Sequence, residues 1–210
     1  TISILFSIED NFKESLKRIC IEAEKAIRKG YSFIILSDRG VNKDRAALPC
    51  LLAVGRVHHH LIRKALRTQI GIIVESGEPK EVHHFALLFG YGADCINPYL
   101  AYKSLEYLVS EGMLAINFKT AFKNYRKAVE KGILKILSKM GISTLQSYRG
   151  AQIFEALGLD QEVIDRCFDG NVSRIGGAGF EAIEKEVLLR HNQAFIERNL
   201  EVPYLATGGI

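Results

Sequence analysis

Hydrophobic positions follow two different periods along the first half of the chain. Residues 33–37 and 70–74 are short runs rich in β-branched residues, typical of buried strands, and residues 12–30 repeat apolar side chains at helical spacing. The same reasoning predicts four more elements: strands at 2–6 and 94–96, and helices at 51–65 and about 80–89, the last opened by Pro79. Strands that alternate with helices in this way predict a parallel sheet built from β/α units.

The pattern changes after residue 97. Two helices are expected in succession, at residues 99–109 and 118–139, followed by a last strand with its loop at 141–147. Further helices are expected at residues 151–157, 161–168 and 180–195. Helices therefore outnumber strands in this second half.

These patterns predict a single α/β domain over residues 1–210. Residues 1–97 form strand-helix repeats, and residues 98–200 form a helix-rich part with one further strand. The strands are too few for a complete eight-stranded barrel. The predicted fold class is therefore a partial or rudimentary β/α (TIM-barrel-like) parallel sheet with added helices.

The loop after the strand at 70–74 is the most informative local feature. In barrels that bind phosphate, a glycine-rich loop at this place lets backbone amides close on the anion. Here the loop reads Glu75-Ser76-Gly77-Glu78, so a carboxylate stands where a second glycine is needed. The sequence therefore predicts the outline of a phosphate-binding unit that has lost its ligand.

Other polar residues follow the predicted strands. Asp38 and Arg39 come directly after one strand, and Ser76 after another, at the carboxyl ends where such proteins place functional groups. Asp and Ser at these places also commonly cap the following turn, and we favour that structural role. Residues 176–179, Gly-Gly-Ala-Gly, match no nucleotide-binding motif and indicate a hinge.

A second polar loop lies between residues 141 and 149. Ser143, Thr144, Ser147 and Tyr148 cluster there, with Arg149 at the edge. The loop could form a pocket for a small regulatory ligand, or it could contact a neighbouring domain, since no base or nucleophile motif accompanies it.

The histidines and cysteines indicate core residues. Neighbours in the triplet His58-His-His60 point about 100° apart on a helix, so they cannot converge on one metal ion. His58 lies on the apolar face, and we expect it to be buried and hydrogen-bonded. The four cysteines are far apart within apolar patterns and are expected to be reduced core thiols.

Composition narrows the class of protein. The net charge of +4 is spread along the chain, and its densest basic stretch, residues 119–139, indicates a solvated helix face and no nucleic-acid partner. No apolar run is long enough to span a membrane, and no signal peptide is visible, so we expect a cytoplasmic protein. The first residue is threonine and residues 206–210 close no element, which suggests a segment cut from a longer protein.

Several long strings carry a family resemblance. The strings at residues 35–41, 49–63, 74–94 and 134–158, the last reading LKILSKMGISTLQSYRGAQIFEALG, closely resemble the large subunit of glutamate synthase. They are similar to its central domain. The resemblance implies an enzyme that makes glutamate from glutamine and 2-oxoglutarate with electrons from NAD(P)H or ferredoxin, in the cytoplasm or, for a plant-type enzyme, the plastid stroma.

The resemblance also implies that different domains of the enzyme carry out different steps of the reaction. A glutaminase domain with a cysteine nucleophile releases ammonia, which passes to a domain that holds FMN and an iron-sulfur cluster. This chain has neither an N-terminal cysteine nor a set of closely spaced cysteines, so we expect no catalytic, cofactor or metal residues in it. Domain contacts are expected at six residues: Asp38, Arg39, Ser76, Ser147, Tyr148 and Arg149.

The function expected is that of a connecting scaffold between the glutaminase and FMN domains, inactive by itself. The alternative is a free-standing FMN- or phosphate-binding β/α-barrel-type enzyme that uses the loops at residues 75–78 and 143–149.

Overall fold

A computed structural model of the chain describes residues 1–195. The interpretation of residues 206–210 lies wholly outside the described residues. The prediction of a helix-rich part at residues 98–200 lies partly outside them.

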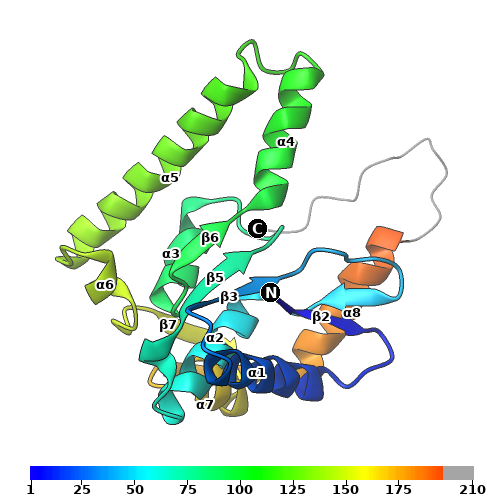
Figure 1. Cartoon of the computed structure of the whole chain (residues 1–210), viewed down its shortest axis with the longest axis vertical. Coiled ribbons are helices and arrows are strands. Elements are labelled where there is room, and N and C mark those ends of the chain that lie inside the picture. The colour runs from blue at the N-terminus through cyan, green and yellow to red at the C-terminus, as the bar shows by residue number, and fades with distance from the viewer. Residues whose placement is uncertain (196–210) are drawn as a thin grey trace.

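The centre of the fold is a parallel sheet of four strands whose order in space, β1-β3-β5-β6, follows their order in the chain. The strands are β1 (Ile2–Ser3), β3 (Phe33–Ser37), β5 (Gly71–Glu75) and β6 (Cys95–Asn97). Each is joined to the next through a helix, as in successive units of a β/α barrel. The predicted fold class, a partial parallel β/α sheet with added helices, is confirmed (Figure 1).

The first predicted strand, residues 2–6, divides into two in the structure. After β1 the chain changes partner, and β2 (Leu5–Ser7) pairs antiparallel with β4 (Arg45–Ala47). Between them, the Ile4 N–H donates to Ser37 O and the Ile4 carbonyl accepts from Leu48 N. Strand β4 was not predicted, because its three residues carry no alternating pattern.

Three helices connect the strands of the sheet. They are α1 (Phe12–Arg28), α2 (Cys50–Arg63) and α3 (Val82–Gly90). Apolar side chains of α1 and α2 pack with the sheet in one large core, as their periodicity predicted. Helix α3 begins after an N-cap at Glu81, so the prediction that Pro79 opens it was wrong. The side chains of Glu81 and His84 form a capping box that sets this start.

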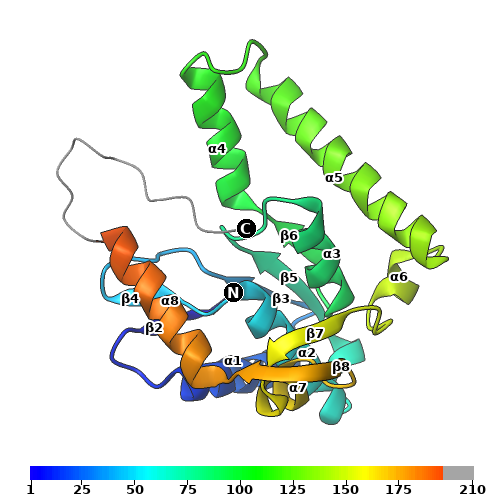
Figure 2. The same ribbon diagram turned by 180° about the vertical axis from the view of Figure 1, so that it is seen from behind.

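Helices α4 (Tyr99–Ser110) and α5 (Phe118–Met140) form an arm that projects from the sheet. Both views show the pair extending well beyond the rest of the chain (Figures 1 and 2). The base of α5 is held by a second, smaller core in which Ile133 and Leu137 pack with Phe85 of α3. The arm is therefore anchored at one end.

The predicted strand at 141–147 is wrong. Gly141 adopts the left-handed conformation, with φ 67°, and ends α5 as its C-cap. Thr144 then caps a short helix, α6 (Leu145–Tyr148), by accepting a hydrogen bond from Ser147 N. A glycine C-cap followed by a threonine N-cap is a helix-to-helix signal, and it outweighs the β-branched residues between them.

The region after residue 150 contains two strands where a helix and a hinge were predicted. Strands β7 (Glu155–Leu159) and β8 (Val172–Ala178) pair in parallel across α7 (Gln161–Cys167), and α8 (Phe180–Phe195) follows. The predicted helix at 151–157 and the predicted hinge at 176–179 are therefore wrong. Glycine is needed in β8 because a Cβ at Gly177 would lie 2.5 Å from Gly158 O. The predictions for α7 and α8 are confirmed.

Candidate functional site

The carboxyl end of the sheet holds the polar cluster that the sequence led us to expect. Glu75, the last residue of β5, accepts hydrogen bonds from Ser37 Oγ at 2.8 Å and Asn97 Nδ2 at 3.3 Å. Its carboxylate also pairs with Arg39 Nε at 2.7 Å. The ion pair with Arg39 and these hydrogen bonds lower the pKa of Glu75, so it stays ionised. Glu75 thus links the ends of three neighbouring strands.

Asp38 and Ser76 face each other across the same end of the sheet. The Ser76 hydroxyl donates to Asp38 Oδ2 at 2.6 Å, and the Gly77 N–H donates to the same oxygen at 2.9 Å. Both side chains are buried, with Asp38 5% and Ser76 0% exposed. Burial and the neighbouring Asp38 carboxylate raise the pKa of Tyr99 to about 12. The two residues therefore fix the turn after β5, the structural role that we favoured.

Glu78 lies at the amino end of helix α2. Its Oε2 accepts a hydrogen bond of 2.7 Å from Cys50 N, the first residue of that helix. Pro49, at the N-cap position, makes no side-chain capping bond, so Glu78 supplies the cap from 28 residues away. A helix amino terminus is where an anion binds in this kind of fold, because its free N–H groups and dipole favour negative charge. Here a carboxylate of the chain itself occupies that position.

Chemically, this cluster supports structure better than catalysis. Three carboxylates and one arginine give it a formal charge of −2, which disfavours an incoming phosphate. Within the described residues, Asp38 Oδ1 is the one carboxylate oxygen here that is buried without a partner. No metal ligand set accompanies it among residues 1–195.

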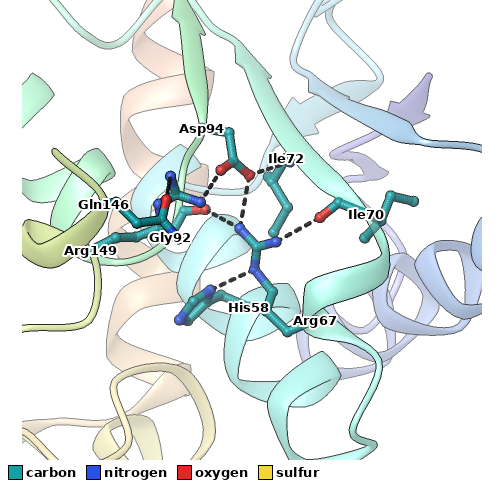
Figure 3. Close-up of polar contacts among 8 residues, drawn as sticks. All are labelled: His58, Arg67, Ile70, Ile72, Gly92, Asp94, Gln146 and Arg149. Atoms are coloured by element: carbon teal, nitrogen blue, oxygen red, sulfur yellow. Dashed lines mark hydrogen bonds and ion pairs between the residues drawn. The ribbon is translucent and has the colours of Figure 1, made fainter.

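A second polar cluster lies at the opposite, amino end of the sheet, and it is built around Arg67 of the short 3-10 helix η1 (Arg67–Gln69). Its guanidinium donates to His58 Nδ1 at 2.9 Å, Ile70 O at 2.6 Å and Gly92 O at 2.8 Å. It also pairs with Asp94 Oδ2 at 2.8 Å (Figure 3). Arg67 therefore ties together the starts of β5 and β6 and the inner face of α2.

Asp94 is shared between two guanidinium groups. Its Oδ2 accepts from Arg67 and from Ile72 N at 2.8 Å, while its Oδ1 pairs with Arg149 beyond α6. Arg149 also donates to Gln146 Oε1 at 2.9 Å (Figure 3). The side chains of Arg67, Asp94 and Arg149 are only 13%, 23% and 21% exposed, so the network is largely shielded from water. It fastens the segment after α5 to the sheet.

His58 completes this network as a neutral acceptor. It is buried, as predicted, and burial together with the positive Arg67 lowers its pKa to about 3. A Cβ at Gly92, whose φ is 112°, would lie 2.2 Å from His58 Nδ1. Only glycine therefore permits this close approach and this backbone conformation. The prediction of a hydrogen-bonded core histidine is confirmed.

The structure separates the six residues that were expected to make domain contacts. Asp38, Arg39 and Ser76 lie at the carboxyl end, but Arg149 lies at the amino end, where it pairs with Asp94. The expectation that residues 147–149 follow a strand at its carboxyl end was wrong, because that segment is helix α6 and its C-cap.

Burial also divides these six residues. Asp38, Ser76 and Tyr148 are buried against residues of this chain, and Tyr148 packs in the second core with its hydroxyl unpartnered among the described residues. Arg39 and Ser147 are exposed. Contact of any of the six with another domain stays a prediction.

Sequence reasoning missed Arg67 and Asp94 as a pair. Asp94 is the first residue of a predicted strand, and Arg67 follows a predicted helix, but nothing in the spacing of 27 residues pairs them. An Asp within an otherwise apolar strand pattern was the available signal, since such a residue needs a partner when it is shielded from water.

Of the four cysteines, three are buried as predicted. Burial raises the pKa of Cys20 to about 11 and of Cys167 to about 12, and burial with the nearby Glu78 carboxylate raises that of Cys50 well above its usual value. The prediction for Cys95 was wrong, because this residue is exposed on edge strand β6.

Features typical of metalloproteins and of membrane-spanning proteins are absent from the described residues. In residues 1–195 no group of three or more His, Cys, Asp or Glu side chains is placed to hold a metal ion. No helix in that part of the chain has the length and apolarity needed to cross a membrane.

Comparison with known proteins gives consistent similarities. The family described as "Glutamate synthase central domain" matches residues 1–160. The large chain of the NADPH glutamate synthase of Bacillus subtilis is 52% identical over 194 residues, which are 92% of this chain and 13% of that protein.

Two eukaryotic proteins are similar at the same level. The NADH glutamate synthase of Schizosaccharomyces pombe is 47% identical over 91% of this chain, and the ferredoxin-dependent glutamate synthase of Pyropia yezoensis is 46% identical over 93%. This chain spans only 9% and 14% of their lengths. The three relatives are named for three different electron donors.

Proposed function

The chain belongs to the glutamate synthase central-domain family, and from this premise we propose that it is a connecting scaffold in such an enzyme. In this role it holds a glutaminase domain and an FMN and iron-sulfur domain of the same polypeptide in register. Glutamine and 2-oxoglutarate are then converted to glutamate without loss of the ammonia passed between them. The chain by itself is inactive.

The observation that carries the scaffold proposal is the bond between Glu78 and helix α2. The amino terminus of α2, a helix end that could receive an anion, is filled by a carboxylate of the chain, since Glu78 Oε2 lies 2.7 Å from Cys50 N. The other carboxylates of that end are likewise engaged with their neighbours. Polar groups that are consumed in fixing loops favour a rigid spacer over a reactive site.

The proposal assigns chemistry to the rest of the polypeptide. FMN, the iron-sulfur cluster and the glutaminase nucleophile lie in other domains, and this chain contributes no ligand to them. Neither nucleic acid nor membrane is proposed as a partner. The location is the cytoplasm, or a plastid stroma, as the name of a chloroplastic ferredoxin-dependent relative in Arabidopsis thaliana suggests.

Ammonia transfer in the intact enzyme tests the scaffold. Asp94→Ala releases both Arg67 and Arg149 and loosens the segment after α5. We expect the variant to hydrolyse more glutamine than it consumes 2-oxoglutarate, with ammonia appearing in the medium, whereas the unaltered enzyme consumes both in equal amounts. Glu186→Ala, which opens an exposed pair with Arg190, is the matched control.

A result with both rates lowered but glutamine and 2-oxoglutarate still consumed equally would contradict the scaffold. It would indicate that Asp94 supports folding or activity without governing the transfer of ammonia between domains.

Titration of the purified chain with FMN tests the alternative function. The structure disfavours a flavin or phosphate site made of residues 75–78 and 143–149, because the first loop is at the carboxyl end of the sheet and the second is tied to the amino end. We expect a colourless protein with no saturable FMN binding at micromolar concentration. A yellow preparation would overturn the scaffold proposal.

A further inference from the structure

Helix α5 carries a lysine at every fourth residue along nearly its whole length. We call these six residues the lysine ladder: Lys119, Lys123, Lys127, Lys131, Lys135 and Lys139. Successive members are neighbours on a helix surface, each turned by about 40° from the last, so together they form one winding stripe. The stripe is about 30 Å long at 1.5 Å per residue.

The ladder faces solvent. All six lysines are exposed, and the buried positions of α5, such as Ile133 and Leu137, lie on the side that packs in the second core. The arm itself projects away from the sheet, so no other part of the described chain covers the stripe (Figures 1 and 2).

The ladder differs from the charged faces of the other helices because its lysines lack acidic partners. Helices α1, α7 and α8 pair several of their cations with Glu three or four residues away, as in Arg18 with Glu22 and Arg190 with Glu186. Among residues 1–195 none of the ladder lysines makes an ion pair, although Arg126 on the same helix pairs with Glu130.

The expectation that the net charge is spread along the chain was wrong, because it is concentrated on this arm. Residues 99–140 contain eight Lys and Arg and three Glu, a formal charge of +5, whereas the whole chain carries +4. Like charges four residues apart destabilise a helix, and the ladder contains five such pairs. No acidic side chain of residues 1–195 forms an ion pair with these lysines, which points to an acidic surface elsewhere.

Exposed apolar side chains accompany the ladder. Leu134, three residues after Lys131 and thus next to it, is 63% exposed, and Met113 at the tip of the arm is 64% exposed. Tyr107 on α4 is also exposed. Apolar groups beside these cations are complemented by a partner surface that is acidic and partly apolar, whereas the phosphates of nucleic acid supply charge alone.

From these observations we propose that the lysine ladder docks on an acidic, partly apolar surface in the remaining polypeptide of the same enzyme. The rest of the polypeptide is the proposed occupant because this chain spans only 9–14% of the length of these three relatives. The inference rests on the proposed scaffold function, to which it adds the surface that makes the contact. Complementary charge then fixes the register of the domains.

Amine labelling of the intact parent enzyme tests this docking. Lys25 and Lys29 of α1 provide an internal control, since they are exposed, four residues apart and unpaired within the described residues. We expect ladder lysines to be acetylated several-fold more slowly than this pair, and the difference to shrink at high salt. Ladder lysines that react as fast as Lys25 and Lys29 would overturn the proposal.

Zero-length carbodiimide cross-linking of the same enzyme identifies the occupant. The expected products join ladder lysines to Asp or Glu residues outside these 210 residues. Protection that appears only after RNA or anionic phospholipid vesicles are added would overturn a protein partner.

The double variant Lys127→Glu/Lys131→Glu is designed to abolish the proposed contact of the ladder. It should lose the cross-links, whereas Lys25→Glu/Lys29→Glu should keep them, with circular dichroism confirming that both are folded. The ammonia-transfer measurement tests the scaffold proposal separately. If the ladder lysines are exposed in an enzyme that consumes glutamine and 2-oxoglutarate equally, the docking surface is rejected and the scaffold proposal is retained.

Discussion

The two ends of the parallel sheet carry polar clusters built in opposite ways. At the carboxyl end, Asp38, Glu75 and Glu78 are held mainly by neutral donors and by one exposed arginine. At the amino end, a single carboxylate, Asp94, is shared by two guanidinium groups that are largely shielded from water. The first cluster has a formal charge of −2 and the second, with His58 neutral, of +1.

Polar residues at the carboxyl end of a strand therefore do not by themselves mark a functional site. The carboxyl end resembles an active site in its residue types, but its groups are used to cap a helix and to close turns. The amino end, where function is not expected in such folds, holds the contacts that join the sheet to the segment beyond α5.

The largest expected effect is a difference between the two ends in how much free energy of unfolding is lost when a carboxylate is removed. Removing one partner of a buried ion pair leaves the other charge uncompensated, so we expect Asp94→Ala to lower the free energy of unfolding by about 3 kcal/mol. Asp38→Ala leaves only a hydroxyl and an N–H unpaired, and should cost about 1–2 kcal/mol. Urea denaturation of the purified chain measures both, and equal losses would contradict the distinction.

The next effect is the pH dependence of stability that His58 contributes at the amino end. The folded pKa of His58 is about 3, below its usual value of 6.5, so its contribution to stability is complete above pH 6.5 and is lost as pH falls toward 3. Between pH 6.5 and pH 5 the loss is about 2 kcal/mol, at about 1.4 kcal/mol for each pH unit.

His58→Gln is the matched variant for this pH dependence. Its amide oxygen can accept the hydrogen bond from Arg67 but does not titrate, so stability measured over the same range should fall less steeply. A slope as steep as that of the unaltered protein would exclude His58 as its source.

A smaller effect is expected at the carboxyl end. Glu78→Ala removes the cap of α2 and should cost about 1 kcal/mol, while Glu78→Gln keeps an acceptor and should cost less. Added phosphate should raise the thermal unfolding temperature of Glu78→Gly, because the helix terminus is vacated in this variant. It should not raise that of the unaltered chain. Stabilisation of the unaltered chain by phosphate would show that Glu78 does not fill an anion position.

The smallest expected effect concerns the reactivity of two thiols and involves no change in stability. Cys95 at the start of β6 is exposed, whereas Cys50 at the carboxyl end is buried and its raised pKa keeps it protonated. Iodoacetamide should therefore add once to the native chain, at Cys95, as intact mass spectrometry can show. Labelling of Cys50 before denaturation would mean that the carboxyl end opens readily.

Several parts of this fold could be read from local pattern. Strand β3 has the predicted bounds, Phe33–Ser37, and α5 extends only one residue beyond its prediction. The buried His58 was likewise predictable, because its place on an apolar helix face does not depend on distant partners. The meeting of Asp38 with Ser76 followed from topology, since the carboxyl ends of neighbouring parallel strands coincide.

Other parts could not be read in this way. Strands β7 and β8 exist because they pair with each other across α7, and their own residues have no clear strand period. The wrong helix at 151–157 and the wrong strand at 141–147 both come from judging a short segment without its partner or its caps.

Sequence pattern was therefore enough to identify the family, the parallel β/α core and the carboxylate of Glu78 in the loop after β5, because each depends on residues that are close together in the chain. Only the tertiary structure decided what Glu78 does and where Arg149 goes. The cap on Cys50 spans 28 residues and the pair between Asp94 and Arg149 spans 55. Such contacts depend on how the chain closes on itself, because charge and hydrogen bonding act over a few ångströms in space whatever the separation in sequence.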